Sequence, residues 1–371
     1  MDRVVLVHDW LTGMRGGEKC LEAMCRRWPE APLYTLFYKR GSVSPAIANR
    51  RIVTSILDAL PASHRYYRYL LPLMPWAVGW RLPECELVMS SSHCVAKGVA
   101  PPAGVPHVCY CHTPMRYAWH MQDAYFEERG WGGPKRWLAN KVLARLRAWD
   151  RRTAAHVTHF IANSQVVRQR IRDCYDRDAV VIHPPVDTEF YCPADVPRED
   201  YYLILSAFAP YKRLDLAIAA CQKLGRTLIV IGSGQDEKKL RRHASDRIRF
   251  LGWQPDEVLR DHLRRCKALL FPGEEDFGIV PVEAQACGTP VICYGRGGAT
   301  ETVVNGVTGR WFEEQTADCL ANAIEQFEVE RNAYDSRTLR QHALQFRAER
   351  FEQELFGYID SVMGRSQRLA A

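Results

Sequence analysis

The sequence predicts an α/β protein made of two Rossmann-like, doubly wound domains that face a cleft. Short β-rich runs alternate with helical segments, which is typical of a parallel sheet with helices on both faces. The alternation occurs in two series, separated by a Pro-rich stretch at 183–197 that breaks regular structure. The 371 residues are too many for one ordinary core and suit two domains of α/β size.

The strand candidates fall six in the first series and five in the second. They are 4–8, 33–37, 87–90, 107–111, 160–162 and 180–183, then 202–206, 227–231, 248–251, 268–271 and 291–293. A helical segment at 336–363 closes the chain. We therefore predict a first domain at 1–190, a second at 191–345, and a C-terminal helix at 346–371 that returns to the first domain.

The composition, with 47% hydrophobic and 25% charged residues, is that of a soluble globular protein. No apolar run reaches the roughly 18 residues needed to span a bilayer. The chain enters a strand-like run at Val4 without a signal-peptide pattern. Thirteen cysteines lack paired spacing, which is typical of reduced thiols. We expect a cytoplasmic protein.

Basic residues are concentrated between Trp131 and Arg152, where Asp150 is the one acid. On a helix, four apolar residues of this stretch would share one face. Packing against the domain core explains the apolar face, and an anionic membrane surface explains the charges. A stretch at 66–76 also mixes aromatic, basic and apolar residues. The first domain is therefore predicted to face a lipid-linked partner. The basic residues are Lys135, Arg136, Lys141, Arg145, Arg147, Arg151 and Arg152, and the apolar ones Leu138, Val142, Leu146 and Trp149.

Glu275 and Glu283 lie in a turn punctuated by Gly278 and Pro281. Pro281 stands near the start of a short helix that Gly288 ends. Backbone N–H groups at a helix start favour an anion such as a diphosphate. Carboxylates beside it suit the hydroxyl groups of a sugar or ribose. The same spacing also fits a capped helix with two solvated acids.

Glu275 and Glu283, with Phe277-Gly278 between them, resemble the signature of the family 4 glycosyltransferases, which have the GT-B fold. The similarity runs nearly end to end and includes 288–291, 297–301 and 305–309. It implies a retaining transfer from a nucleotide sugar, in which Glu275 binds the sugar and Glu283 the ribose hydroxyls. The predicted donor-binding residues are Gly16, Gly17, Arg213, Gly232, Phe277, Gly278, Ile279, Val280 and Glu283.

Lys212 follows a strand and is placed like the diphosphate-binding lysine of this family. An ammonium group there would neutralise charge that develops on the leaving group. The family's usual arginine five positions earlier is Ala207 here, so either Arg213 replaces it or one positive charge is missing. A solvated Lys-Arg pair is the competing interpretation. Gly232, after a strand, could support the nucleotide, although no third glycine completes a dinucleotide fingerprint.

In the first domain, His112 follows a buried-looking strand and resembles the family's active-site histidine. The resemblance implies hydrogen bonding to donor sugar or acceptor, and a core histidine is the alternative. His93 is a second candidate of the same kind. Gly16-Gly17 matches the family's glycine-rich loop, where the backbone can approach a phosphate or the acceptor. A simple tight turn is the competing interpretation.

We predict His112, Glu275 and Lys212 as the catalytic group, with no metal and no cofactor beyond the donor. Asp176-Arg177-Asp178 has the D-x-D spacing alone, within a polar loop. Cys109-x-Cys111 lacks the second ligand pair of a structural metal site.

Segments 7–12, 112–117 and 210–213 look most like a bacterial branch with mannosyltransferases of O-antigen and exopolysaccharide assembly. That branch implies GDP-mannose as donor and an undecaprenyl-diphosphate-linked glycan as acceptor, at the cytoplasmic face of the inner membrane. No nucleic-acid partner is expected. Three alternatives stay open: a UDP-sugar-dependent transferase of the same fold, a GT-B-fold sugar-nucleotide epimerase, and a non-catalytic glycan- or nucleotide-sugar-binding subunit.

Overall fold

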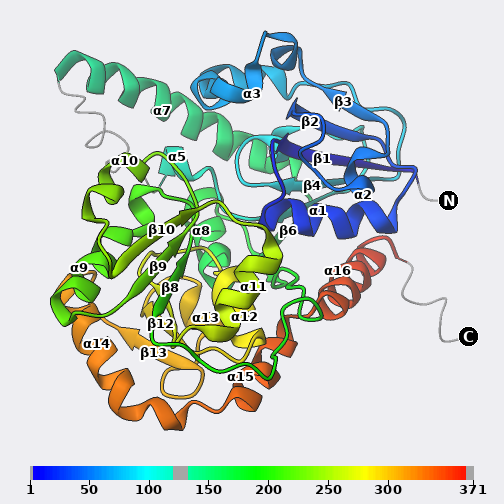
Figure 1. Cartoon of the computed structure of the whole chain (residues 1–371). Helices are drawn as coiled ribbons and strands as arrows, with labels where there is room; N and C mark the ends of the chain where they lie inside the picture. The colour runs from blue at the N-terminus through cyan, green and yellow to red at the C-terminus, as the bar shows by residue number, and fades with distance from the viewer. Residues whose placement is uncertain (1–2, 120–132, 365–371) are drawn as a thin grey trace, which may run out of the picture. The chain divides into compact units, whose positions relative to one another are not determined.

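The computed structural model describes residues 3–119 and 133–364, which form two compact units (Figure 1). One unit comprises Met1–Pro184 and Glu352–Ala371, and the other comprises Pro185–Phe351. The sequence placed the corresponding divisions after residues 190 and 345. Each unit contains one parallel sheet with helices, so the prediction of two doubly wound α/β units is confirmed.

The first unit is built on a seven-stranded parallel sheet in the order β3-β2-β1-β4-β5-β6-β7. The short edge strand β3 escaped prediction. The last strand ends before His183, ahead of two prolines that cannot donate to a ladder. Its strands are β1 (Val4–Leu11), β2 (Leu33–Tyr38), β3 (Ile52–Thr54), β4 (Leu87–Ser92), β5 (His107–Cys111), β6 (His159–Ala162) and β7 (Ala179–Val181). Its helices include α1 (Gly16–Arg27), α2 (Pro45–Ala48), α3 (Ser63–Tyr66), α4 (Met74–Ala77), α5 (Arg116–Trp119), α7 (Gly133–Thr153) and α8 (Gln165–Tyr175).

The second unit contains a six-stranded parallel sheet in the order β10-β9-β8-β11-β12-β13. Its strands are β8 (Tyr202–Leu205), β9 (Leu228–Ile231), β10 (Ile248–Gly252), β11 (Leu269–Phe271), β12 (Val291–Tyr294) and β13 (Gly309–Phe312), the last of which was not predicted. Its helices are α9 (Leu214–Leu224), α10 (Glu237–Leu240), α11 (Asp256–Arg265), α12 (Ile279–Ala286), α13 (Ala299–Thr302), α14 (Ala317–Glu330) and α15 (Ser336–Ala343).

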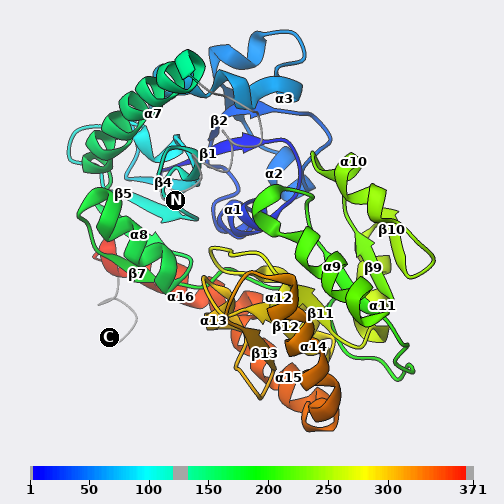
Figure 2. The same ribbon diagram turned by 90° about the vertical axis from the view of Figure 1, so that its left-hand side faces the viewer.

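Both faces of the second sheet are buried, as expected for parallel strands. Tyr202 and Ile204 pack with apolar residues of α9 and α14. Their neighbours Leu203 and Leu205 point to the opposite face and pack with residues of α11 and α12. Figure 2 shows these helices around the sheet. Alternate side chains of β8 are thus buried on opposite faces of the sheet, so that only residues at the ends of the strands are left to contact a ligand.

The C-terminal segment is two helices and not the single one predicted. After α15, a 3-10 turn (Leu344–Phe346) ends at Arg347, whose backbone is extended. The Val186 N–H bonds to the Phe346 carbonyl (2.9 Å), which diverts that carbonyl from a continuous helix. Helix α16 (Ala348–Val362) then joins the first unit, where Phe356 packs edge-on against Trp28 at 5.6 Å. The predicted return of the C-terminal helix is confirmed.

Candidate active site

Both sheets share the strand order of a doubly wound fold, in which neighbouring loops diverge at one point of the carboxyl edge. In the first unit this point lies between β1 and β4. In the second unit it lies between β8 and β11. Ligands of open α/β sheets bind at such points. Each unit therefore offers one candidate half-site, and the predicted residues divide between them.

In the second unit, Lys212 and Glu275 meet across this point. Lys212 ends a 3-10 turn after β8, and Glu275 follows β11. The Lys212 Nζ forms an ion pair with the Glu275 Oε1, and both side chains are largely buried. The structure thus brings together two residues that lie 63 positions apart and were predicted from separate motifs. The pair concentrates one positive and one negative charge at the strand ends.

Glycines line this half-site because the backbone segments touch. A Cβ on Gly273 would lie 2.8 Å from the Lys212 Cα. A Cβ on Gly298 would collide with the Phe277 backbone. Gly232 has φ +136°, which L side chains rarely adopt, and a Cβ there would meet the Ser206 carbonyl. No side chain fits at these positions, so the loops pack directly, backbone against backbone.

Helix α12 starts at Ile279, directly after Gly278, whose φ of +93° requires glycine. Ile279 and Val280 are half-buried at the helix start, where backbone N–H groups attract anions. Phe277 is buried and packs against Phe346 at 5.6 Å between ring centroids. Glu283 lies within the helix and is 6% exposed. Gly288, at φ +79°, terminates the helix as predicted.

Arg213 pairs with a different carboxylate from Lys212. Its backbone has φ +51°, and its guanidinium Nε lies 3.2 Å from the Asp215 Oδ1. Asp215 therefore neutralises part of the charge that was considered a replacement for an arginine at Ala207. Ala207 itself is exposed.

In the first unit, His112 follows β5 and is half-buried. Its Nε2 lies 2.8 Å from the Ser91 Oγ, and the same hydroxyl lies 3.1 Å from the His8 Nδ1. Burial, followed by the nearby charges of His93 and His8, lowers the pKa of His112 to about 3. His112 is therefore a neutral imidazole near pH 7, suited to hydrogen bonding and not to charge pairing.

Asp9 organises the loop that carries His93. Its carboxylate accepts four backbone N–H groups, from His93 through Ala96, at 2.6 to 3.0 Å. The His93 Nδ1 lies 3.2 Å from the Asp9 Oδ2. Burial alone raises the pKa of Asp9, but the charges of His93 and His8 and these N–H groups bring it below the usual value. His93 thus has a structural partner in Asp9.

Gly17 of the predicted glycine-rich loop lies in the first turn of α1 beside the histidines. A Cβ on Gly17 would be 3.5 Å from the His112 Nε2 and 3.7 Å from the His8 Cε1. Gly16 begins the same helix. The loop therefore approaches His112, although this position, unlike Gly273, leaves room for a methyl group.

Four residues of this half-site were not predicted: His8, Asp9, Glu18 and Ser91. His8 and Asp9 are polar residues inside an otherwise apolar strand, and both are fully buried. That interruption was the available signal, because buried polar groups need specific partners. Ser91 is likewise a fully buried polar residue, in β4, but its partners His8 and His112 lie 83 and 21 positions away in the sequence.

The D-x-D spacing at 176–178 has a structural explanation. Asp176 ends α8 with φ +55°. Asp178 forms ion pairs with Arg168 (2.9 Å) and Arg172 (3.0 Å). Within residues 3–119 and 133–364, no group of three His, Cys, Asp or Glu side chains is arranged to hold a metal ion.

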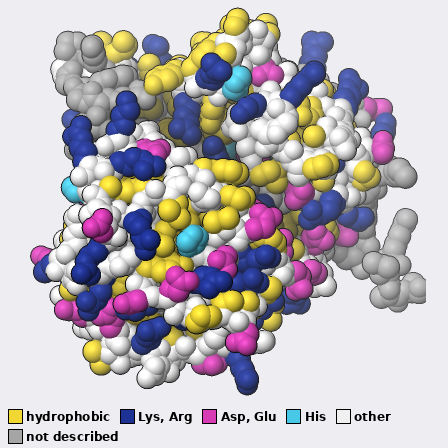
Figure 3. Space-filling model, in the orientation of Figure 1, with side chains coloured by type: hydrophobic (Ala, Val, Ile, Leu, Met, Phe, Trp, Pro, Cys, Tyr) yellow, Lys and Arg dark blue, Asp and Glu magenta, His cyan; other side chains and the backbone are white. Residues whose placement is uncertain are grey.

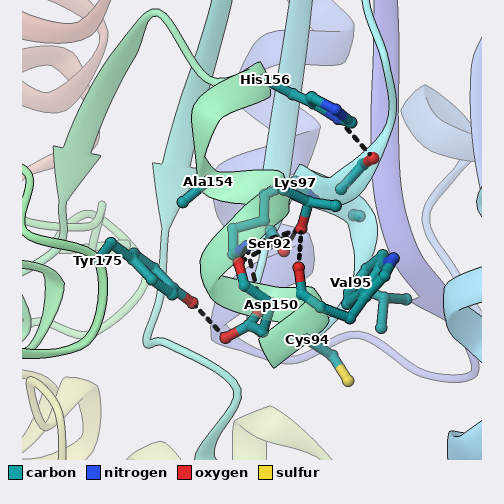
Figure 4. A network of polar contacts seen from close by, with 12 residues as sticks. Ser92, Cys94, Val95, Lys97, Asp150, Ala154, His156 and Tyr175 are labelled. Atoms are coloured by element: carbon teal, nitrogen blue, oxygen red, sulfur yellow. Dashed lines mark hydrogen bonds and ion pairs between the residues drawn. The ribbon is translucent and has the colours of Figure 1, made fainter. Parts of the chain in front are cut away.

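A buried ion pair lies beside the His93 loop (Figure 4). The Lys97 Nζ is 2.9 Å from the Asp150 Oδ1, and both side chains are almost fully buried. The second Asp150 oxygen accepts hydrogen bonds from the Trp119 Nε1 and the Tyr175 hydroxyl, each at 2.8 Å. Asp150, the one acid of the basic stretch, is therefore buried and fully paired. It ties α7 to the loop that Asp9 holds.

The predicted apolar face of α7 is only partly correct. Leu146 is buried in a cluster with Met74 and with Val142, whereas Leu138 is 59% exposed, as is Trp137. Trp131, at the start of the predicted stretch, lies outside the described residues.

Exposed apolar side chains also occur at Tyr69 and Leu73, in the 3-10 segment between α3 and α4, and at Trp76 in α4. In Figure 3, hydrophobic and basic side chains share the surface over the region that Figure 1 labels α3 and α7. The Lys141 Nζ lies 3.7 Å from the centre of the Trp137 ring. None of the described helices is long and apolar enough to cross a bilayer.

Two family models match the chain in succession: "Glycosyltransferase Family 4" at residues 14–190 and "Glycosyl transferases group 1" at residues 194–342. Among curated proteins, the D-inositol 3-phosphate glycosyltransferase of Mycolicibacterium smegmatis is 29% identical over 211 residues, 50% of this chain and 49% of the relative. That of Kribbella flavida is 33% identical over 39% of this chain and 41% of its own. The chain thus spans about half the length of the curated relatives it matches.

Solved structures agree over nearly the whole chain. Anabaena HepE in complex with UDP has a TM-score of 0.71 at 17% identity, covering 97% of this chain and all of its own. Sucrose-phosphate synthase from Thermosynechococcus elongatus has a TM-score of 0.72 at 16% identity, covering 98% of this chain and all of its own. At such identities the likeness supports the fold alone.

Proposed function

We propose that this chain, which two glycosyltransferase family models match in succession, transfers a hexose from a nucleotide sugar to an acceptor with retention at the anomeric carbon. The second unit would bind the donor, and the first unit would face the acceptor. The observation that carries the proposal is the Lys212–Glu275 pair among glycine-lined strand ends.

Each part of the second half-site suits one group of a nucleotide sugar. A diphosphate would compete with Glu275 for the Lys212 ammonium, and the first N–H groups of α12 favour its negative charge. Glu275, released from Lys212, would accept hydrogen bonds from sugar hydroxyls, and Glu283 from the ribose. Charge that develops on the leaving diphosphate is then stabilised by groups already in place. No metal or cofactor has a role in this scheme.

For the donor we propose GDP-mannose, as the resemblance to bacterial O-antigen and exopolysaccharide mannosyltransferases implies. A UDP-sugar is the second candidate, because the similar structure of HepE was determined with UDP and with UDP-glucose. The relatives from Mycolicibacterium smegmatis and Kribbella flavida carry the name D-inositol 3-phosphate glycosyltransferase, which specifies neither a donor sugar nor its base.

For the acceptor we propose a lipid-linked glycan at the cytoplasmic face of the membrane, to which the protein binds peripherally. The basic helix α7 and the exposed Trp76, Trp137 and Leu138 support this location. Aromatic residues beside Lys and Arg favour the headgroup region of anionic bilayers.

The test is a donor screen that follows nucleotide release from GDP-mannose and several UDP-sugars, with and without a lipid extract. Release from one donor that rises with the extract supports the proposal. Formation of a free epimer would establish the epimerase instead. Tight donor binding without release under any condition would indicate a non-catalytic subunit.

The membrane surface is tested separately by sedimentation with anionic and neutral vesicles. We expect binding to the anionic vesicles only, and roughly tenfold weaker binding for Trp76→Ala with Trp137→Ala, because the two side chains would contribute buried apolar area. The matched control is Trp253→Ala, an exposed tryptophan of the second unit. Equal binding of all three proteins would place the membrane contact elsewhere.

A further inference from the structure

Three neighbouring strands bring His8, Ser91 and His112 into one row. His8 of β1 is the direct register partner of Ser91 in β4. The next strand, β5, pairs Cys111 with Ser92, and His112 follows at its end. The backbone extends this pairing, since the His112 N–H bonds to the Ser92 carbonyl at 2.8 Å. The row is therefore set by sheet register and does not depend on a flexible loop.

Hydrogen-bond chemistry fixes where the protons of this row lie. The His8 Nδ1 is 3.0 Å from the Ser91 carbonyl oxygen, which can only accept, so Nδ1 carries the proton. The same N–H also faces the Ser91 Oγ at 3.1 Å. The Ser91 hydroxyl, facing a donor on one side, directs its own proton to the other neighbour. That neighbour is the His112 Nε2, at the shorter distance of 2.8 Å.

His112 therefore accepts at Nε2 and, as a neutral ring, carries its proton at Nδ1. No hydrogen bond to this Nδ1 occurs within the described part of the chain, and His112 is half-buried. The far end of the row is closed by Glu18 of α1. Its Oε1 lies 3.8 Å from the His8 Nε2, while its Oε2 accepts the Arg15 N–H at 3.1 Å.

We propose that Ser91 and His8 are positioning residues that hold His112 in the Nδ1–H form, so that it presents an N–H donor to an oxygen of the sugar or acceptor. The identity of the ligand rests on the proposed function, but the direction of the hydrogen bonds from His8 through Ser91 to His112 is a property of the protein alone. His112 would otherwise populate both neutral forms, and only one of them donates from Nδ1. Removal of the Ser91 hydroxyl removes the donor to Nε2 and the preference with it.

The test is ¹⁵N NMR of the histidine-labelled, full-length protein at pH 7, in which the two ring nitrogens of each neutral form differ in shift. His112 is assigned from the signal lost in His112→Gln. We expect a pure Nδ1–H form in the unmodified protein and a mixture in Ser91→Ala. Ser91→Thr, which keeps a hydroxyl, should restore the single form.

Ser90→Ala provides the matched control on the same strand. The Ser90 Oγ lies 2.7 Å from the His107 Nε2, so this variant should alter His107 and leave His112 unchanged. An Nε2–H form of His112 in the unmodified protein overturns the proposal even if no variant folds. An unchanged His112 spectrum in a folded Ser91→Ala protein overturns it as well.

Activity gives a separate readout. With the donor found in the screen, Ser91→Ala should lower kcat/KM about three- to tenfold, the loss of one oriented neutral hydrogen bond, and Ser91→Thr should recover most of it. If no donor is turned over, the proposed function fails while the NMR result still decides the direction of the row. A mixed His112 population with undiminished kcat/KM overturns the positioning role.

Discussion

The two half-sites occupy equivalent points of two sheets with the same strand order, yet one is built mainly from polar side chains and the other mainly from glycine backbone. In the first unit the point is filled by the buried imidazole of His8, two half-buried imidazoles and buried carboxylates, and Asp9 alone accepts four backbone N–H groups. In the second unit it is lined by glycines around the Lys212–Glu275 ion pair.

The doubly wound topology thus supplies a place for a ligand in each unit, and the side chains at that place decide its chemistry. Neutral, oriented hydrogen-bonding groups such as His112 suit hydroxyl groups. A lysine beside bare backbone suits a diphosphate. Four predictions test this contrast.

The largest effect is expected where the first half-site depends on its buried ion pair. Lys97→Met leaves the Asp150 carboxylate buried without its cation, which costs about 3–5 kcal/mol of the free energy of unfolding. Urea titration measures the loss, and hydrogen exchange should show that segment 93–97 loosens more than segment 271–279. Lys223→Met, which removes an exposed lysine paired with Asp318, is the control and should cost little. A loss below about 1 kcal/mol for Lys97→Met would show that the Lys97–Asp150 ion pair does not stabilise the first half-site.

The second prediction concerns charge in the second half-site. Lys212→Ala and Glu275→Ala should each lower kcat/KM by about 10²- to 10³-fold, because each removes a preorganised polar group from the reacting region. The assay is nucleotide release with the donor identified by the screen, and Lys223→Ala serves as control in the same unit. Turnover of both variants at the unmodified rate would remove these residues from the proposed site.

The third prediction compares glycines across the two half-sites. Gly234 lies beside Gly232 in the loop after β9, and a Cβ on it would lie 2.7 Å from the Phe208 backbone nitrogen. Gly234→Ala must therefore shift the loop and should cost about 1–3 kcal/mol of the free energy of unfolding. Gly17→Ala places its Cβ no closer than 3.5 Å to a side chain and should change the free energy of unfolding by less than about 0.5 kcal/mol. Thermal unfolding of both variants measures the difference. Equal losses of unfolding free energy in the two variants would contradict the distinction between a backbone-lined and a side-chain-lined site.

The fourth prediction is a gradual dependence of stability on pH. Burial lowers the pKa of His107 and of His112 to about 3, from 6.5 when exposed. Stability from their neutral forms is complete above pH 6.5 and is lost as the pH falls towards 3, because the unfolded chain takes up protons first. For each histidine, the free energy of unfolding falls by at most about 1.4 kcal/mol for each pH unit of acidification.

Unfolding followed between pH 7 and 5 should show this slope, and His107→Gln should reduce it. Hydrogen exchange should report the loss first in strands β4 and β5, where these histidines pair with serines. A stability that stays flat across this range would mean that both histidines titrate normally.

The second half-site was largely predictable from local sequence. Pro281 and Gly288 delimit α12, and the resemblance singles out Lys212, Glu275 and Glu283 through short motifs. What local sequence could not indicate is that Lys212 and Glu275 pair with each other, since they follow different strands. Likewise, Leu138 shares a helical period with Leu146, but only the core beside α7 decides which of them is covered.

Most residues of the first half-site could not be predicted from local sequence. Only His112, His93 and the two glycines were predicted, and His8 and Ser91 were not. Alternation of apolar runs and the spacing of breakers are local properties, so they are sufficient for the fold class and the two-unit organisation. The short motifs are local too, and they single out the residues that we propose to bind the donor. The His8–Ser91–His112 row and the burial of Asp150 depend on register between strands and on packing between elements distant in the chain. Those contacts form when parallel strands align and expel water, so they exist only in the tertiary structure.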